Sequence, residues 1–153
     1  MEQMHGNNYR RLMWMTLLSF ISMYVLMYSM VNSFENVFSS WNQVYMAGVM
    51  ASPMVIIELL LMSGMYQKKK LKGMILAISV VALVGFFTMI RQQTAIGDKQ
   101  FLRSMIPHHA GAILMCREAS IRDPEIKDLC KTIVLGQQAE IDQMKAKLNE
   151  LSK

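Results

Sequence analysis

Charged residues are almost absent from three long stretches of this sequence. Residues 12–31 and 73–90 carry none, and residues 44–65 carry only Glu58. Each stretch reaches the roughly 18–20 apolar residues that a helix needs to cross a bilayer, where every backbone polar group must be bonded within the chain. The missing charge therefore predicts three transmembrane helices in residues 12–90, with the lipid bilayer as their partner.

A signal-peptide cleavage site is also missing. Arg10 and Arg11 precede the first apolar stretch, as they would in a signal peptide. However, this stretch is longer than the roughly 7–15 apolar residues of a signal peptide, and no Ala-x-Ala-like site follows it. We therefore expect a membrane anchor.

Basic residues are absent from the first loop, and this absence predicts the orientation. The second loop, in contrast, carries Lys68, Lys69, Lys70 and Lys72, and residues 1–11 carry two arginines. Because Lys and Arg concentrate in cytoplasmic loops, residues 1–11 and the second loop should be cytoplasmic. Everything after residue 90 should lie outside the cytoplasm. Residues 1–11 also contain His5, which we expect to be a solvated residue rather than a ligand.

Neither a nucleic-acid surface nor an enzyme is indicated. The net charge of +5 divides into six basic against three acidic residues in residues 1–90 and ten against eight in residues 91–153. The tail thus has the mixed signs of a solvated helical surface. The sequence contains no Ser-His-Asp pattern, no pair of Glu-x-x-His motifs and no nucleotide-binding loop.

The tail predicts two helices. Residues 91–100 form a polar connector, and apolar or small residues then recur at helical spacing up to Ile121. Pro107 should either occupy the first turn or kink a longer helix. Asp123 and Pro124 have the types preferred at an N-cap and first helical position, so a second helix should run to about Leu151. Residues 101–153 should form a helical hairpin.

A hairpin of this size cannot bury both of its apolar seams alone. It must pack against another hairpin or against the membrane helices. Since the chain contains one hairpin, we expect a homo-oligomer, a dimer in the simplest case, that completes a four-helix bundle. The expected fold class is all-α.

Soft-metal ligands fall at one level of this hairpin. With Asp123 at the centre of the turn, Cys116 faces Cys130 and His109 faces Gln137. By the roughly 1.5 Å rise per residue, six residues share one slab: Met105, His108, His109, Gln137, Glu140 and Met144.

Thioether and imidazole together suit Cu(I), and Ag(I) by analogy. Gln137 and Glu140 could orient a histidine ring. Adjacent histidines point about 100° apart on a helix, so one of them should face a partner hairpin or a second ion. Packing in a core is the alternative for the methionines. For the two cysteines, core packing, a disulfide and soft-metal ligation remain open.

The tail resembles a known family. "MIPHHAGAILM", followed by "DPE" and "QQAEIDQM", is similar to the repeated pattern of the CopM-like copper-binding family, domain of unknown function 305. The resemblance implies a ferritin-like four-helix bundle, a periplasmic location, and copper or silver binding linked to metal resistance. It implies Cu(I) as the bound ion, with Ag(I) or Cu(II) as alternatives. The implied ligands are Met105, His108, His109, Met115 and Met144.

Two features depart from the family. Cysteines stand where alanine is more usual, so Cys116 becomes a further expected ligand or a disulfide partner. Only one repeat is present, which again requires self-association. A periplasmic copper carrier or efflux system would be a suitable partner.

The second apolar stretch suggests an alternative function. Its methionines and Glu58 recur every fourth residue, so Met50, Met54 and Glu58 could line a transmembrane metal path. Eukaryotic copper channels also have three spans, but the third stretch of this sequence lacks the Gly-x-x-x-Gly motif of their third span. A further alternative is an assembly module that organises a membrane partner and binds no metal.

Overall fold

The computed structural model describes residues 2–152, with side chains from Asn7 onward. Within this range the ordered segments are helical and no strand occurs. The chain forms two compact units: residues Met1–Leu26 with Asn42–Thr94, and residues Met27–Trp41 with Ala95–Lys153. The all-α prediction is confirmed for the described residues.

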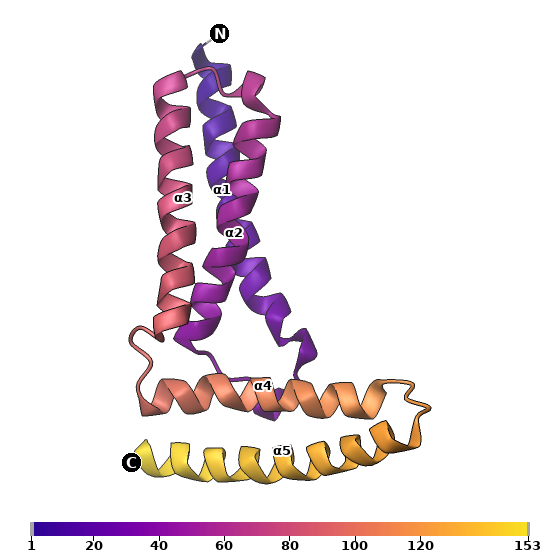
Figure 1. Cartoon of the computed structure of the whole chain (residues 1–153). Helices are drawn as coiled ribbons and strands as arrows, with labels where there is room; N and C mark the ends of the chain where they lie inside the picture. Colours follow the sequence, from indigo (N-terminus) through magenta and orange to yellow (C-terminus); the bar gives the residue numbers. More distant parts are fainter. Residues whose placement is uncertain (1, 153) are drawn as a thin grey trace. The chain divides into compact units, whose positions relative to one another are not determined.

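The first unit contains three long helices, α1 (Glu2–Leu26), α2 (Trp41–Leu61) and α3 (Lys69–Gln92), with the short helix η3 (Ser63–Met65) between the last two (Figure 1). Segments Asn7–Met30, Trp41–Leu61 and Lys69–Gln92 are long and apolar enough to cross a membrane. The three predicted spans are thus present as helices of the required length and composition.

Helix α2 buries the largest share of its surface in this unit. Its buried face is built from small residues interspersed with larger ones: Tyr45, Ala47, Gly48, Ala51, Ser52, Val55 and Leu59. Gly48 lies against the ring of Phe86 in α3, where an added Cβ would come within 2.4 Å of the ring. Small residues at such positions let membrane helices approach closely.

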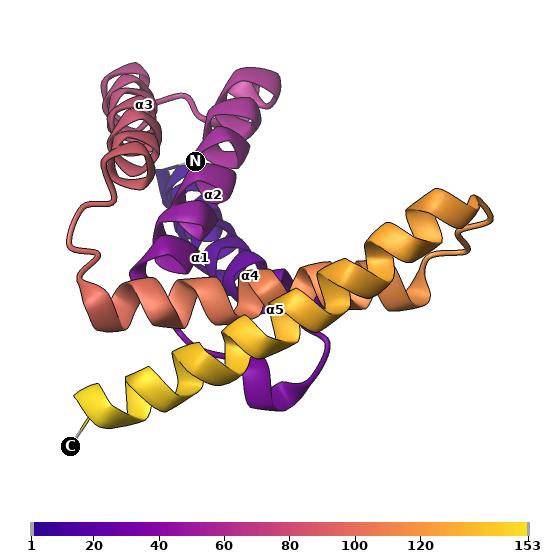
Figure 2. The same ribbon diagram turned by 60° about the horizontal axis from the view of Figure 1, so that its bottom comes forward.

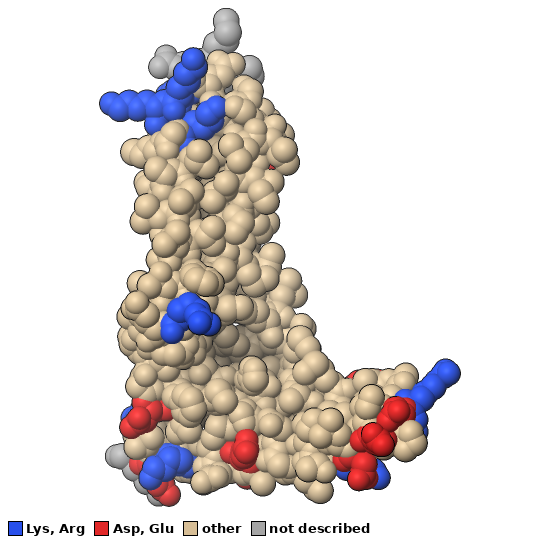
Figure 3. All heavy atoms as spheres, viewed as in Figure 1, with Lys and Arg blue, Asp and Glu red and all other residues tan. Residues whose placement is uncertain are grey.

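The ends of α1 and α3 that carry the basic residues lie together. Asn8 donates a hydrogen bond to the carbonyl of Met65 (3.1 Å), and the Tyr9 hydroxyl donates to the carbonyl of Lys68 (3.3 Å). Figure 3 shows the resulting concentration of Lys and Arg at one end of this unit. The basic residues used to predict orientation therefore share one end of the three-helix unit.

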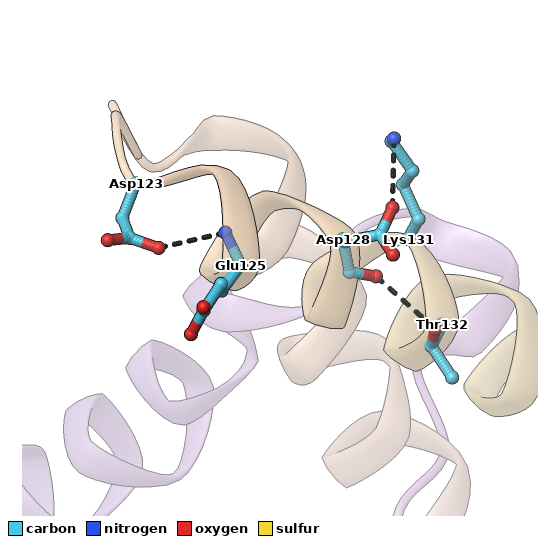
Figure 4. Close-up of polar contacts among 5 residues, drawn as sticks. All are labelled: Asp123, Glu125, Asp128, Lys131 and Thr132. Carbon is cyan, nitrogen blue, oxygen red and sulfur yellow. Dashed lines mark hydrogen bonds and ion pairs between the residues drawn. The ribbon is translucent and has the colours of Figure 1, made fainter.

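The second unit contains α4 (Asp98–Glu118), α5 (Pro124–Leu151), and the short helices η1 (Met27–Met30) and η2 (Phe34–Asn36) of the first loop. The N-terminus of α5 has the predicted cap: Asp123 Oδ1 accepts hydrogen bonds from the backbone N–H groups of Glu125 (2.9 Å) and Ile126 (3.1 Å), and Figure 4 shows the first of these. Pro124 occupies the first turn, where its missing N–H costs nothing.

Helices α4 and α5 pack against each other, with α5 passing across α4 at an angle in Figure 2. Their shared core consists of Ile106, Ala110, Ile113, Ile141 and Leu148. Val31 and Phe38 of the first loop also pack against this core. The loop between the first two spans is therefore an integral part of the unit that contains α4 and α5.

The boundaries differ slightly from the predicted ones. Helix α3 continues to Gln92 and α4 already begins at Asp98, so the connector is shorter than residues 91–100. Gln93 ends α3 in the left-handed conformation. Pro107 lies inside α4 rather than in its first turn, which leaves the carbonyl four residues earlier without its helical hydrogen-bond donor.

Candidate functional site

His109 occupies the most enclosed polar position of the α4–α5 interface. It is 8% exposed and lies among the core residues of α4. Its Nδ1 lies 3.0 Å from the carbonyl oxygen of Met105, and its Nε2 lies 2.7 Å from Oε2 of Glu140 on α5. Because a carbonyl can only accept, Nδ1 must carry a proton. The ring is thus held at both nitrogens.

The sequence register explains this pairing with one correction. Cys116 and Cys130, expected to face each other, are joined by a disulfide, with a Cα–Cα distance of 5.2 Å. His109 contacts Glu140 rather than the matched residue Gln137, which is partly buried one helical turn nearer the loop. Helical side chains tilt toward the N-terminus of their own helix. In an antiparallel pair, the α4 side chain therefore leans away from the turn and the α5 side chain leans toward it. A residue of α4 consequently meets a residue of α5 whose Cα atom lies farther from the turn than its own, as Glu140 does relative to His109.

The predicted methionine ligands have different surroundings. Met144 packs against the α4–α5 core, and Met105 is partly buried while its carbonyl accepts from His109. Met115 is 54% exposed and lies about 9 Å beyond His109 along α4, by the usual helical rise. The structure therefore places Met144 against the α4–α5 core and Met105 one turn before His109, and it leaves Met115 near the loop.

His108 lies on a different face of α4 from His109. Its side chain is exposed, and the centres of the two rings are 6.1 Å apart with their planes at 63°. The expectation that adjacent histidines diverge agrees with this geometry. His108 is accessible to a group outside its own chain.

A cluster of His, Cys, Asp and Glu ligands does not occur in the described part of the chain. Among those residues, no group of three or more His, Cys, Asp or Glu side chains could hold a metal ion. The bond from His109 Nδ1–H to the Met105 carbonyl is of the kind that orients histidine ligands in metal sites, and it leaves Nε2 as the atom that could act as a donor. An ion at Nε2 would have to replace the contact with Glu140, whose side chain is 58% exposed and can move aside.

The disulfide decides between the alternatives that the sequence left open for the cysteines. In this oxidised form Cys116 has no thiolate to offer to a metal, because its sulfur is bonded to that of Cys130. Cys116 is therefore not a ligand in the structure as it stands.

The residues of the alternative membrane path have different surroundings. Met50 is 40% exposed and Met54 is partly buried. Glu58 lies in the last turn of α2 and accepts a hydrogen bond from the hydroxyl of Tyr66 (3.1 Å). A small cavity of about 130 Å³ beside this pair is lined by residues that include Arg11 and Met15. Glu58 thus has a partner close to the end of its helix.

Sequence reasoning missed two contributors. Tyr66, which follows the span that carries Glu58 and donates a hydrogen bond to it, is 3% exposed. The packing of Val31 and Phe38 on the α4–α5 core was not anticipated. The apolar side chains within the first loop, among them Phe34, Val37 and Phe38, were the available signal.

The comparisons with known proteins identify the family. The family model described as "Domain of unknown function (DUF305)" matches residues 39–148, which span α2, α3, α4 and most of α5. An uncharacterised protein of Acanthamoeba polyphaga mimivirus is 33% identical over 139 residues, which cover 89% of this chain and 90% of the relative. No solved structure matches the chain. The chain therefore belongs to the DUF305 family.

Proposed function

We propose that this chain is a membrane-anchored protein that binds Cu(I) or Ag(I) outside the cytoplasm and buffers the ion or hands it over, in support of metal resistance. The site is built from methionine and histidine on α4 and α5. The protein performs no catalysis of its own. The ion is its cargo.

The observation that carries the proposal is the fixation of His109. A buried ring whose Nδ1–H is bound to a backbone carbonyl presents Nε2 in one direction. Copper binding at Nε2 requires removal of the proton shared with Glu140, so the carboxylate and the ion compete for the same nitrogen. Glu140 then remains beside the site as an anionic neighbour.

The methionines supply the softness that distinguishes Cu(I) from harder cations. Met105 and Met144 come from the two helices that meet at His109 and belong to the proposed site. His108 and Met115, both exposed, are the residues from which an ion would enter or leave. This division explains why adjacent histidines occupy different environments.

The proposed orientation places the N-terminus in the cytoplasm and α4–α5 in the periplasm of a bacterial inner membrane. The basic end formed by the start of α1 and the start of α3 supports this assignment, since Lys and Arg remain on the cytoplasmic side. The viral relative indicates family membership alone.

Self-association is part of the proposal. The α4–α5 pair leaves large apolar side chains of α5 uncovered, among them Ile126 and Leu129, which lie about one turn apart on the same side of the helix and are 49% and 57% exposed. A second copy packed on this face would complete a ferritin-like four-helix bundle. A periplasmic copper carrier or efflux system is the partner proposed for ion transfer.

The test is an anaerobic Cu(I) titration of the full-length chain in detergent against a chromophoric Cu(I) chelator. We expect tight binding by the oxidised wild type, loss of that binding in the His108→Ala/His109→Ala variant, and weakened binding in Met105→Leu/Met144→Leu. Met74→Leu in α3 is the matched control for loss of a thioether. An unchanged ion count in the double histidine variant would refute the site.

A further inference from the structure

The loop end of the α4–α5 pair carries a second cluster of soft atoms. Cys116 in the last turn of α4 and Cys130 in the second turn of α5 are both partly exposed and form the disulfide. An open cleft of about 560 Å³ adjoins them. Since thiol–disulfide exchange requires that an attacking thiolate reach a sulfur atom, this bond is placed where exchange can occur.

The lining of the cleft indicates which thiol it admits. Arg117, Lys127 and Lys131 contribute positive charge, and Lys131 also forms an ion pair with Asp128 (3.1 Å). Ile121 and Val134 contribute apolar wall. Positive charge at a cleft raises the local concentration of anions. A small anionic thiol is therefore the reductant that this surface favours.

We propose that Cys116 and Cys130 form a redox-gated soft-metal site, closed as the disulfide and opened by an anionic thiol. The first thiolate attacks one cysteine sulfur, which forms a mixed disulfide and releases the other cysteine as a thiolate. A second small thiolate then attacks the small-molecule sulfur of the mixed disulfide, which breaks its bond to the protein, releases the remaining cysteine as a thiolate and forms the oxidised small-molecule disulfide. Two electrons and two protons thus pass from two small thiols to the protein. Binding of Cu(I) between the two sulfurs then releases both protons.

The surroundings fit the product. One Cu(I) between two thiolates carries a net charge of −1, which Arg117 and Lys127 offset. Thiolates are soft ligands that select Cu(I). Opening the disulfide leaves the α4–α5 core and the Asp123 cap intact, so the two sulfurs remain on facing helices. This site shares no ligand with the proposed site at His109.

The experiment compares oxidised and reduced full-length chain in detergent under anaerobic conditions. Reduction with glutathione should release two thiols per chain, counted with a chromogenic thiol reagent, without loss of helical circular dichroism. The reduced chain should then bind one more Cu(I) per subunit than the oxidised chain and show a thiolate-to-copper absorption band. A disulfide that glutathione leaves intact overturns the gate, and an unchanged ion count after phosphine reduction overturns the metal site.

Variants separate this site from the one at His109. The additional ion should persist in His108→Ala/His109→Ala and be absent from Cys116→Ser/Cys130→Ser. An additional ion in the cysteine variant would overturn the assignment. Arg117→Gln/Lys127→Gln should slow reduction by glutathione severalfold and leave reduction by uncharged mercaptoethanol unchanged. The control is Lys145→Gln, which removes a positive charge from α5 away from the cleft. Equal slowing with both thiols would refute the role of the charges.

Discussion

Opening the disulfide should weaken α4–α5 by an amount that follows from its position in the chain. Cys116 and Cys130 are separated by 14 positions, and the constraint on an unfolded loop of about 15 residues is worth about 3 kcal/mol. Amides in α4 and α5 that exchange by opening of this pair should therefore exchange about 150-fold faster in Cys116→Ser/Cys130→Ser. The core around Ile113 should still keep both helices folded.

Native-state hydrogen exchange of the full-length chain in detergent, read by mass spectrometry, measures this difference. Wild type treated with reductant should match the double serine variant, and the variant itself should not respond to reductant. Amides of α3, which belongs to the other unit, provide the internal reference. If protection of α4 and α5 is the same in the oxidised and reduced chains, the disulfide does not constrain the open state and the reasoning from loop length is wrong.

Three further predictions concern other contacts. Gly48→Ala should destabilise the three-helix unit by about 1–3 kcal/mol, because the new Cβ would overlap the ring of Phe86. Gly73→Ala, whose Cβ would meet nothing within 4 Å, is the control and should leave stability unchanged. Thermal unfolding of both variants in detergent measures the difference. Asp123→Ala should destabilise the start of α5 by about 1 kcal/mol through loss of its N-cap, while Asp123→Asn should retain most of the capping energy. Hydrogen exchange of the amides in the first turn of α5 measures both losses, and equal losses would contradict the capping role. Burial of the Tyr66 hydroxyl, and to a smaller extent its hydrogen bond to Glu58, raise the pKa of Tyr66 from 10.0 to about 12. The contribution of Tyr66 to the free energy of unfolding should therefore be complete below pH 10 and decline as the pH rises toward 12. The tyrosinate absorbance difference between wild type and Tyr66→Phe measures that pKa, and a value near 10 would contradict the buried contact.

Local sequence determined the elements of this protein. Residues 12–31 and 73–90 lack charge, residues 44–65 carry only Glu58, and each stretch has the length needed to cross a bilayer, so the three form long apolar helices. Asp123 and Pro124, in the turn that follows α4, begin α5 because N-capping depends on residues within one helical turn. The equal distances of Cys116 and Cys130 from this turn were sufficient to place them opposite each other.

Only the tertiary structure decided which side chains meet. The pairing of His109 with Glu140 depends on how two helices cross and on the tilt of their side chains, neither of which is local. The packing of Phe38 of the first loop on the α4–α5 core is likewise a contact between segments far apart in the chain. Sequence periodicity specifies which face of a helix is apolar, but the partner of that face is fixed by packing between segments far apart in the chain.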